Sequence, residues 1–70
     1  MELANKVREI RQLRGLTQEG LAEQVGVTRQ TIISTEKGYY IPSVKFALEL
    51  SRVLEWQIND LFWLINEDGE

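Results

Sequence analysis

The stretch that decides the fold is residues 17–38, TQEGLAEQVGVTRQTIISTEKG, which contains two helical patterns around a three-residue connection. Thr17 and Thr28 carry hydroxyl groups of the kind that accept hydrogen bonds from free backbone N–H groups at helix starts. Gly26 and Val27, followed by Thr28, form a connection too short for antiparallel helices, so we expect a crossing of about 90–120°. One small core can then be shared by Leu21, Ala22, Val25, Val27 and Ile32.

Three further helices are predicted around this pair. The first runs from about Asn5, its expected N-cap, to Leu13, with a single apolar face formed by Leu3, Val7, Ile10 and Leu13. Another begins after Ser43 and ends near Leu54, without a glycine to stop it. A short last helix is expected to have Asn59 as its N-cap and to include Leu61 and Phe62.

The segment Trp63-Leu64-Ile65 has a strand-like composition and leaves two structures open. It pairs with residues 2–4 in a short β-ladder, or it extends the last helix. With either outcome the chain is expected to be one domain over residues 1–70, an all-α five-helix bundle with the helix-turn-helix arrangement at about residues 18–37.

Composition excludes several classes of function. The chain has no cysteine and no histidine, which are the commonest metal ligands and include the commonest general base. We therefore expect no enzyme, no metal, no cofactor and no evident small-molecule ligand. No apolar run approaches the roughly 20 residues of a membrane span, and residues 1–6 lack the plan of a signal peptide, so a cytoplasmic protein is expected.

The net charge of −3 conceals an uneven distribution. Residues 11–45 hold five basic against three acidic side chains, whereas residues 46–70 hold one basic against six acidic. One end of the molecule can therefore face a polyanion while the other faces away.

The outward side of the second helix of the pair carries guanidinium, amide, hydroxyl and methyl groups, which suit the base edges of a DNA major groove. The candidate base-reading residues are Thr28, Arg29, Gln30, Ile33 and Ser34. Backbone phosphates are expected to be bound by Gln18, Lys37, Tyr40 and Lys45. Gln18 in particular has no evident structural role in the sequence.

The C-terminal region, about residues 54–66, is unusually rich in large apolar residues. Ile58, Leu61 and Phe62 are expected to fill the core, which leaves Trp56, Trp63 and Ile65 as an exposed dimer interface. A dimer is expected because one recognition helix reads too few base pairs to stand out from non-specific binding.

The chain resembles the XRE family of Cro and phage-repressor helix-turn-helix proteins, with the lambda-repressor-like fold. The residues that carry the resemblance run from Arg11 through Gly15-Leu16-Thr17-Gln18-Glu19, Leu21-Ala22-Glu23, Val25-Gly26-Val27 and Arg29-Gln30-Thr31-Ile32 to Glu36, Gly38, Tyr40 and Pro42-Ser43. The resemblance implies a partly buried ion pair between Arg11 and Glu36. Gly20, Ile33, Thr35, Glu55 and Trp56 depart from the family pattern, and Thr35 is expected to loosen the packing behind the recognition helix.

These observations predict a transcriptional regulator that binds double-stranded DNA as a homodimer at a palindromic operator, usually as a repressor. Two alternatives stay open. One is the antitoxin of a toxin–antitoxin pair that represses its own operon, and the other is a protein-interaction module that has lost DNA binding.

Overall fold

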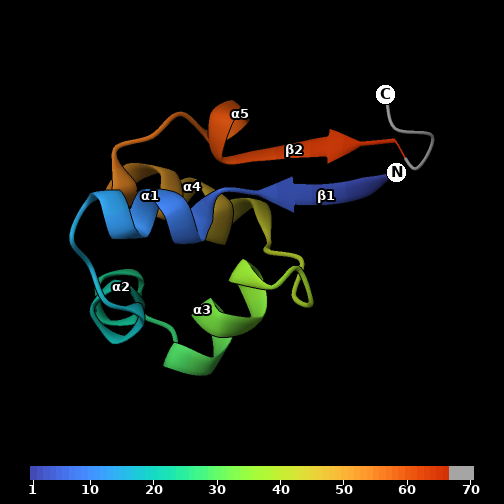
Figure 1. Ribbon diagram of the computed structural model, residues 1–70. Coiled ribbons are helices and arrows are strands. Elements are labelled where there is room, and N and C mark those ends of the chain that lie inside the picture. The colour runs from blue at the N-terminus through green and yellow to red at the C-terminus, as the bar shows by residue number, and fades with distance from the viewer. Residues whose placement is uncertain (67–70) are drawn as a thin grey trace.

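The computed structural model describes residues 1–66, as five helices and a pair of antiparallel strands (Figure 1). The elements are β1 (Glu2–Asn5), α1 (Val7–Leu13), α2 (Gln18–Val25), α3 (Arg29–Glu36), α4 (Val44–Leu54), α5 (Ile58–Leu61) and β2 (Phe62–Ile65). The predicted five-helix bundle is confirmed. Of the two alternatives for residues 63–65, the structure contains the β-ladder, in which Leu3 is paired with Leu64 and Ala4 with Trp63.

Two threonines cap the starts of α2 and α3, and one glycine ends α2. The Thr17 hydroxyl accepts a hydrogen bond from the Gly20 N–H at 2.9 Å, and the Thr28 hydroxyl accepts one from the Thr31 N–H. Gly26 ends α2 in the left-handed region with φ 75°, a conformation that costs little only for glycine. The caps and the stop expected from the sequence are therefore present.

The core lies where α1, α2, α3 and α4 meet and extends to α5. Its buried members are Val7, Ile10, Leu21, Ala22, Val25, Ile32, Phe46, Leu50, Leu54 and Leu61. Val27 packs against it from the turn. On α3 Ile32 and Thr35 face the core, whereas Arg29 and Gln30 at its start are exposed.

Four details of the helix predictions were wrong. Leu13 is 67% exposed, because it is the last residue of α1 and the chain turns away from the core there. Asn5 lies in β1 rather than at the cap position, although its side-chain oxygen still accepts the Val7 N–H at 3.0 Å. Asn59 lies inside α5, which begins after Gln57, and Phe62 belongs to β2 because the ladder with Asn5 ends the helix.

Thr35 shows how a polar residue is accommodated behind the recognition helix. It is 1% exposed, and its hydroxyl donates to the Thr31 carbonyl at 2.7 Å. Its own carbonyl accepts from the Asn5 side-chain amide at 3.0 Å. A buried polar group is costly mainly when unpaired, so these bonds offset the loss of an apolar contact and connect β1 to α3.

The end of α4 holds the one non-glycine residue with positive φ among residues 1–66, Glu55 at φ 54°. Arg14 partly compensates, since it donates to the Leu54 carbonyl at 2.7 Å and to the Glu55 carbonyl at 3.0 Å. No local pattern in the sequence indicates this cap, because Arg14 and Leu54 are 40 positions apart.

We expect Glu55→Gly to raise the free energy of unfolding by about 0.5–1 kcal/mol, because glycine adopts the left-handed conformation without a Cβ clash. The Glu55 carboxylate contributes little, since it is exposed and lies 3.8 Å from Arg14. Urea denaturation followed by circular dichroism measures the change, with Glu55→Ala as the control that keeps the strain. A glycine variant no more stable than the alanine variant would contradict the assignment.

Candidate nucleic-acid interface

The outward side of α3 carries the five residues that the sequence predicts to read bases. Thr28, Arg29 and Gln30 are exposed, and Ile33 and Ser34 are half-buried. Within this set, the Gln30 side-chain amide lies 3.4 Å from the Ser34 hydroxyl, a long contact that leaves the amide easy to redirect toward another acceptor. This face is therefore open and polar, with one aliphatic side chain in it.

An ion pair behind this face joins α1 to α3. Arg11 Nε lies 2.6 Å from Glu36 Oε2, and the two side chains are 9% and 4% exposed. Arg11 also donates to the Leu16 carbonyl at 2.9 Å, so its guanidinium is shared between the α1–α2 turn and α3. The pair therefore holds α3 in place relative to α1.

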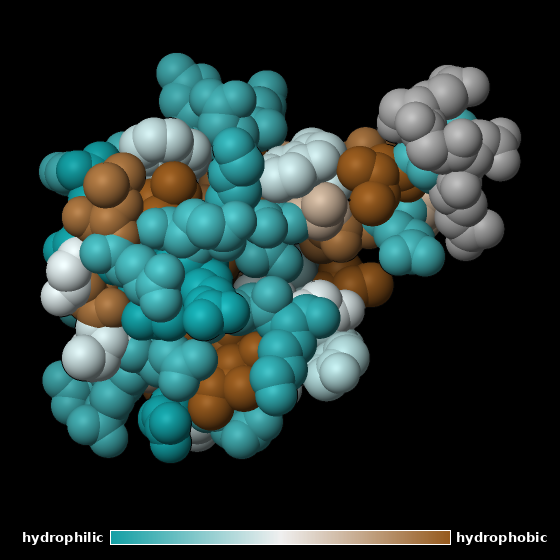
Figure 2. All heavy atoms as spheres, viewed as in Figure 1, coloured by the Kyte–Doolittle hydropathy of each residue, from teal (hydrophilic) through white to brown (hydrophobic). Residues whose placement is uncertain are grey.

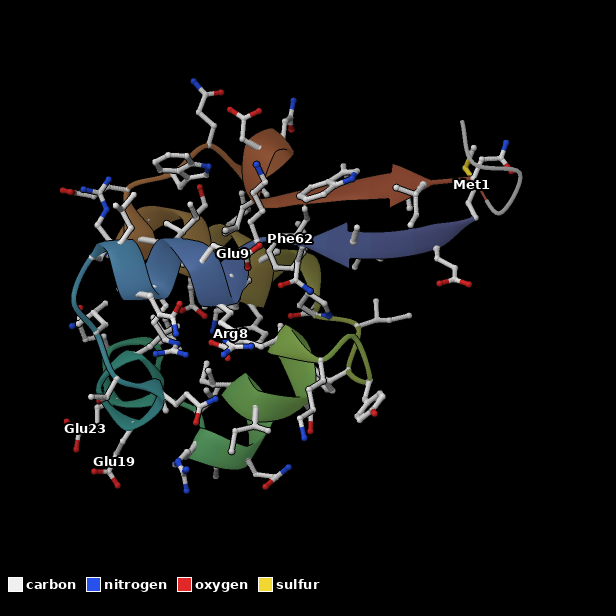
Figure 3. All side chains as sticks on the ribbon, in the orientation of Figure 1. Met1, Arg8, Glu9, Glu19, Glu23 and Phe62 are labelled. Atoms are coloured by element: carbon white, nitrogen blue, oxygen red, sulfur yellow. The ribbon has the colours of Figure 1, made fainter. Side chains whose placement is uncertain are left out.

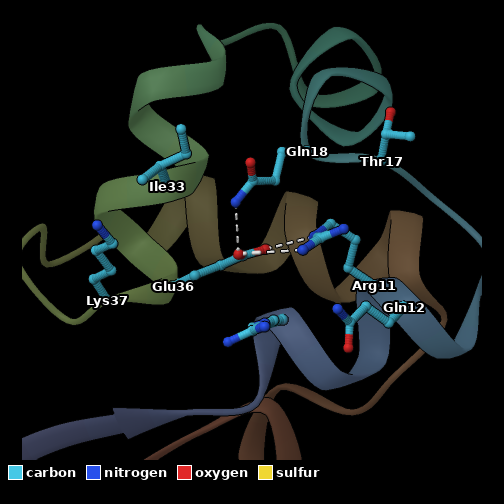
Figure 4. Close-up of a pocket in the computed structure, with 8 residues that line it drawn as sticks. Arg11, Gln12, Thr17, Gln18, Ile33, Glu36 and Lys37 are labelled. Atoms are coloured by element: carbon cyan, nitrogen blue, oxygen red, sulfur yellow. Dashed lines mark hydrogen bonds and ion pairs between the residues drawn. The ribbon is translucent and has the colours of Figure 1, made fainter.

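Gln18 belongs to the same network, which corrects the expectation that it has no structural role. Its side-chain amide donates to Glu36 Oε1 at 3.1 Å and so connects the first turn of α2 to the last residue of α3 (Figure 4). Neither residue signals this contact locally, since 18 positions separate them. A substitution at Gln18 therefore affects the fold as well as any phosphate contact.

A polar groove of about 490 Å³ lies beside this network, between α1, the start of α2 and α3 (Figure 4). Its lining residues are Arg8, Arg11, Gln12, Thr17, Gln18, Ile33, Glu36 and Lys37. Arg8 and Gln12 are not among the residues that the sequence predicts for this interface. Their spacing of four residues on a helix, with Arg11 between them, is the signal that could have placed them on one face.

The four predicted phosphate-binding residues do not converge on one place. Gln18 and Lys37 line the groove together. Tyr40 is exposed in the loop after α3, with its ring 6.2 Å from Phe46 in an edge-on arrangement. Lys45 lies instead on α4, in a shallow apolar groove with Val44, Leu48, Glu49 and Arg52.

The expectation of two exposed tryptophans was wrong. Trp56 is half-buried and packs against the core, and Trp63 is half-buried with Lys6 Nζ 5.9 Å from its ring centroid. The apolar residues that do remain exposed at this end are Leu64 and Ile65, at 62% and 40%. Hydrophobic spheres along the strand pair stand out from the mostly hydrophilic face in Figure 2.

Two features are absent from residues 1–66. No group of three or more histidine, cysteine, aspartate or glutamate residues is placed to hold a metal ion there. In that part of the chain, no helix is both long enough and apolar enough to cross a membrane.

Comparison with known proteins places the interface in context. Residues 7–61, more than half of the chain, match the helix-turn-helix family model. The chain is 46% identical over 66 residues to YgzD of Bacillus subtilis, covering 94% of this chain and 100% of that protein. It is 47% identical over 68 residues to MJ0272 of Methanocaldococcus jannaschii, covering 97% and 100%. Both relatives carry the name uncharacterized HTH-type transcriptional regulator.

Two solved structures are also similar to this chain. The restriction-modification controller protein C.AhdI of Aeromonas hydrophila is 31% identical, with a TM-score of 0.72 over 77% of this chain and 82% of that one. A protein from Bacteroides fragilis at 21% identity has a TM-score of 0.80, covering 87% of this chain and 98% of that chain, and shows the same fold.

Proposed function

Because the chain belongs to the XRE-type helix-turn-helix family of DNA-binding transcriptional regulators, we propose that it acts as a repressor that binds a palindromic operator as a homodimer. The observation that carries this proposal is the outward side of α3, where exposed polar side chains stand clear of the core. Such a face can enter the major groove of B-DNA without rearrangement of the bundle.

The side chains of α3 differ in what they recognise. Gln30 is able to bind adenine through its amide, and Arg29 to bind guanine or hold a phosphate. Ile33 supplies an apolar contact for a thymine methyl group. Thr28 and Ser34 add hydroxyl groups near the same base edges.

Phosphate binding positions the protein and does not itself specify sequence. We assign this role to Gln18 and Lys37 at the groove beside α3. Tyr40 and Lys45 reach the backbone farther along the duplex in this proposal. The unit that binds is the whole domain, with the helix-turn-helix at residues 18–37.

The homodimer is proposed to form through residues 54–66. Exposed Leu64 and Ile65 support this placement. The accessible parts of Trp56 and Trp63, which line one groove together, add further apolar surface in this region. Two protomers joined there double the number of base contacts, and one half-site alone supplies too few for specific binding.

Selection of bound duplexes from random DNA tests the proposal. We expect inverted repeats with half-site centres about one helical turn apart, 10–10.5 bp. Gln30→Ala is expected to relax the preference at one symmetric pair of positions by about 5- to 150-fold, the equivalent of roughly 1–3 kcal/mol. Gln24→Ala is the matched control, because Gln24 is an exposed glutamine on α2 outside the predicted interface.

The outcomes separate the parts of the proposal. Failure to enrich any sequence would contradict specific binding, and enriched sites without dyad symmetry would contradict the homodimer. If Gln24→Ala altered the preference as much as Gln30→Ala did, α3 would not be the reading helix.

A further inference from the structure

We infer that Arg8 of α1 is a further phosphodiester-binding residue in the groove between α1 and α3, where Arg8 and Lys37 hold one DNA phosphate from opposite walls. The inference rests on the proposed function and extends it to α1, a helix outside the helix-turn-helix. It also adds a cationic contact, Arg8, beside the neutral Gln18, whose amide already donates to Glu36.

The charge balance of the groove favours an anion. Glu36 is the only acid among the lining residues, and Arg11 neutralises it at 2.6 Å. Arg8 and Lys37 also line the groove, and neither forms an ion pair with another side chain within residues 1–66. Two uncompensated positive charges therefore face a space of about 490 Å³.

The Glu36 carboxylate at the floor of the groove does not prevent an anion from binding there. Glu36 Oε1 accepts from Gln18 and from Arg11, and Oε2 accepts from Arg11 Nε. Three donated hydrogen bonds reduce the negative potential that an entering phosphate would meet. Gln12, on the same side of α1 as Arg8, offers a further amide donor in the groove.

The position of the groove matches a DNA ligand. Ile33 on α3 and Lys37, the residue directly after α3, lie one turn apart and line the wall of the groove, so the groove borders the face proposed to read bases. Figure 3 shows that the Arg8 side chain leaves α1 on the side that faces α3. When α3 sits in a major groove, this opening meets the sugar-phosphate backbone at its edge.

The test is the salt dependence of Arg8→Gln on the selected operator and on a scrambled duplex of equal length, by fluorescence anisotropy. For one lost phosphate contact in each protomer, the slope of log Kd against log salt is expected to fall by about 2 on the operator. Affinity falls on the order of tenfold on both duplexes, because the contact is independent of sequence.

Arg52→Gln is the control, since it removes the same charge from an exposed residue on α4, outside the groove. Its slope should match that of the wild type. If Arg8→Gln behaved like Arg52→Gln, the phosphate site would be refuted while wild-type operator binding left the proposed function standing. If the wild type bound no duplex, both would fail.

Free inorganic phosphate could bind to the same positive charges, so a second experiment distinguishes it from a DNA phosphodiester. The melting temperatures of the wild type and Arg8→Gln are compared in inorganic phosphate and in chloride at equal ionic strength. Because phosphate stabilises folded proteins generally by exclusion from their surface, the readout is the difference in melting temperature between the two salts. The same difference in the wild type and in Arg8→Gln supports the DNA phosphodiester as the ligand. A stabilisation by phosphate that Arg8→Gln abolishes would assign the groove to a free phosphate and overturn the inference.

Discussion

Glu36→Ala is expected to lower the free energy of unfolding by about 3–5 kcal/mol, because it leaves the Arg11 guanidinium buried without its counter-charge. Arg11 is 9% exposed, and its remaining acceptor is the Leu16 carbonyl. The same variant also removes the acceptor of the Gln18 amide. A domain of this size has a total stability of about 5 kcal/mol, so most of it would be lost. Urea denaturation monitored by circular dichroism measures the effect.

The second Arg–Glu pair in the structure is the matched control. Arg14 and Glu55 lie 3.8 Å apart, with side chains 37% and 77% exposed. Glu55→Ala should change stability by less than about 1 kcal/mol, since exposed pairs contribute little. We also expect Arg11→Met/Glu36→Leu to be more stable than Glu36→Ala, because no charge is left unpaired. A Glu36→Ala variant as stable as Glu55→Ala would show that the buried pair has no structural importance.

Operator binding is expected to weaken by a factor on the order of 10³ between 50 and 200 mM salt, if the dimer neutralises six or more phosphates. The cations that we assign to this contact are Arg29 and Lys37 on the α3 side of the molecule, together with Lys45 and Arg8. The effect is opposite to what the net charge of −3 suggests, because counterions are released locally at the contact face.

Anisotropy titrations at four or more salt concentrations and one pH provide the measurement. A scrambled duplex is titrated in parallel, because non-specific binding is almost entirely electrostatic. The salt-dependent part should therefore make up at least as large a share of the binding free energy for the scrambled duplex as for the operator. A slope near zero for the operator would rule out phosphate neutralisation as a major source of affinity.

Much of the fold was predictable because its signals are local. Thr17 and Thr28 accept hydrogen bonds from residues three positions on, and Gly26 needs only its own backbone conformation to end α2. The exposure of Gln30 follows from helical spacing once Ile32 is inside. These features depend on a few consecutive residues, which is why pattern and capping rules recover them.

The C-terminal segment shows where such rules stop. Trp63 and its neighbours have a composition that fits a strand. However, neither composition nor the alternation typical of strands shows whether a partner strand is present. The pairing of Ala4 with Trp63 required the two ends of the chain to meet. In the folded chain Trp56 packs against the core and is partly buried. The exposed apolar surface at this end is therefore smaller than the sequence indicates.

By itself, the sequence determined the order and type of the helices, the steep turn at Gly26 and the polar side of α3. Only the tertiary structure decided that Gln18 supports Glu36, that Arg14 caps α4 and that Arg8 borders the groove beside α3. The physical reason is range: helix formation and capping act over three or four residues, whereas these contacts join positions 18 to 40 apart that meet only when the core packs.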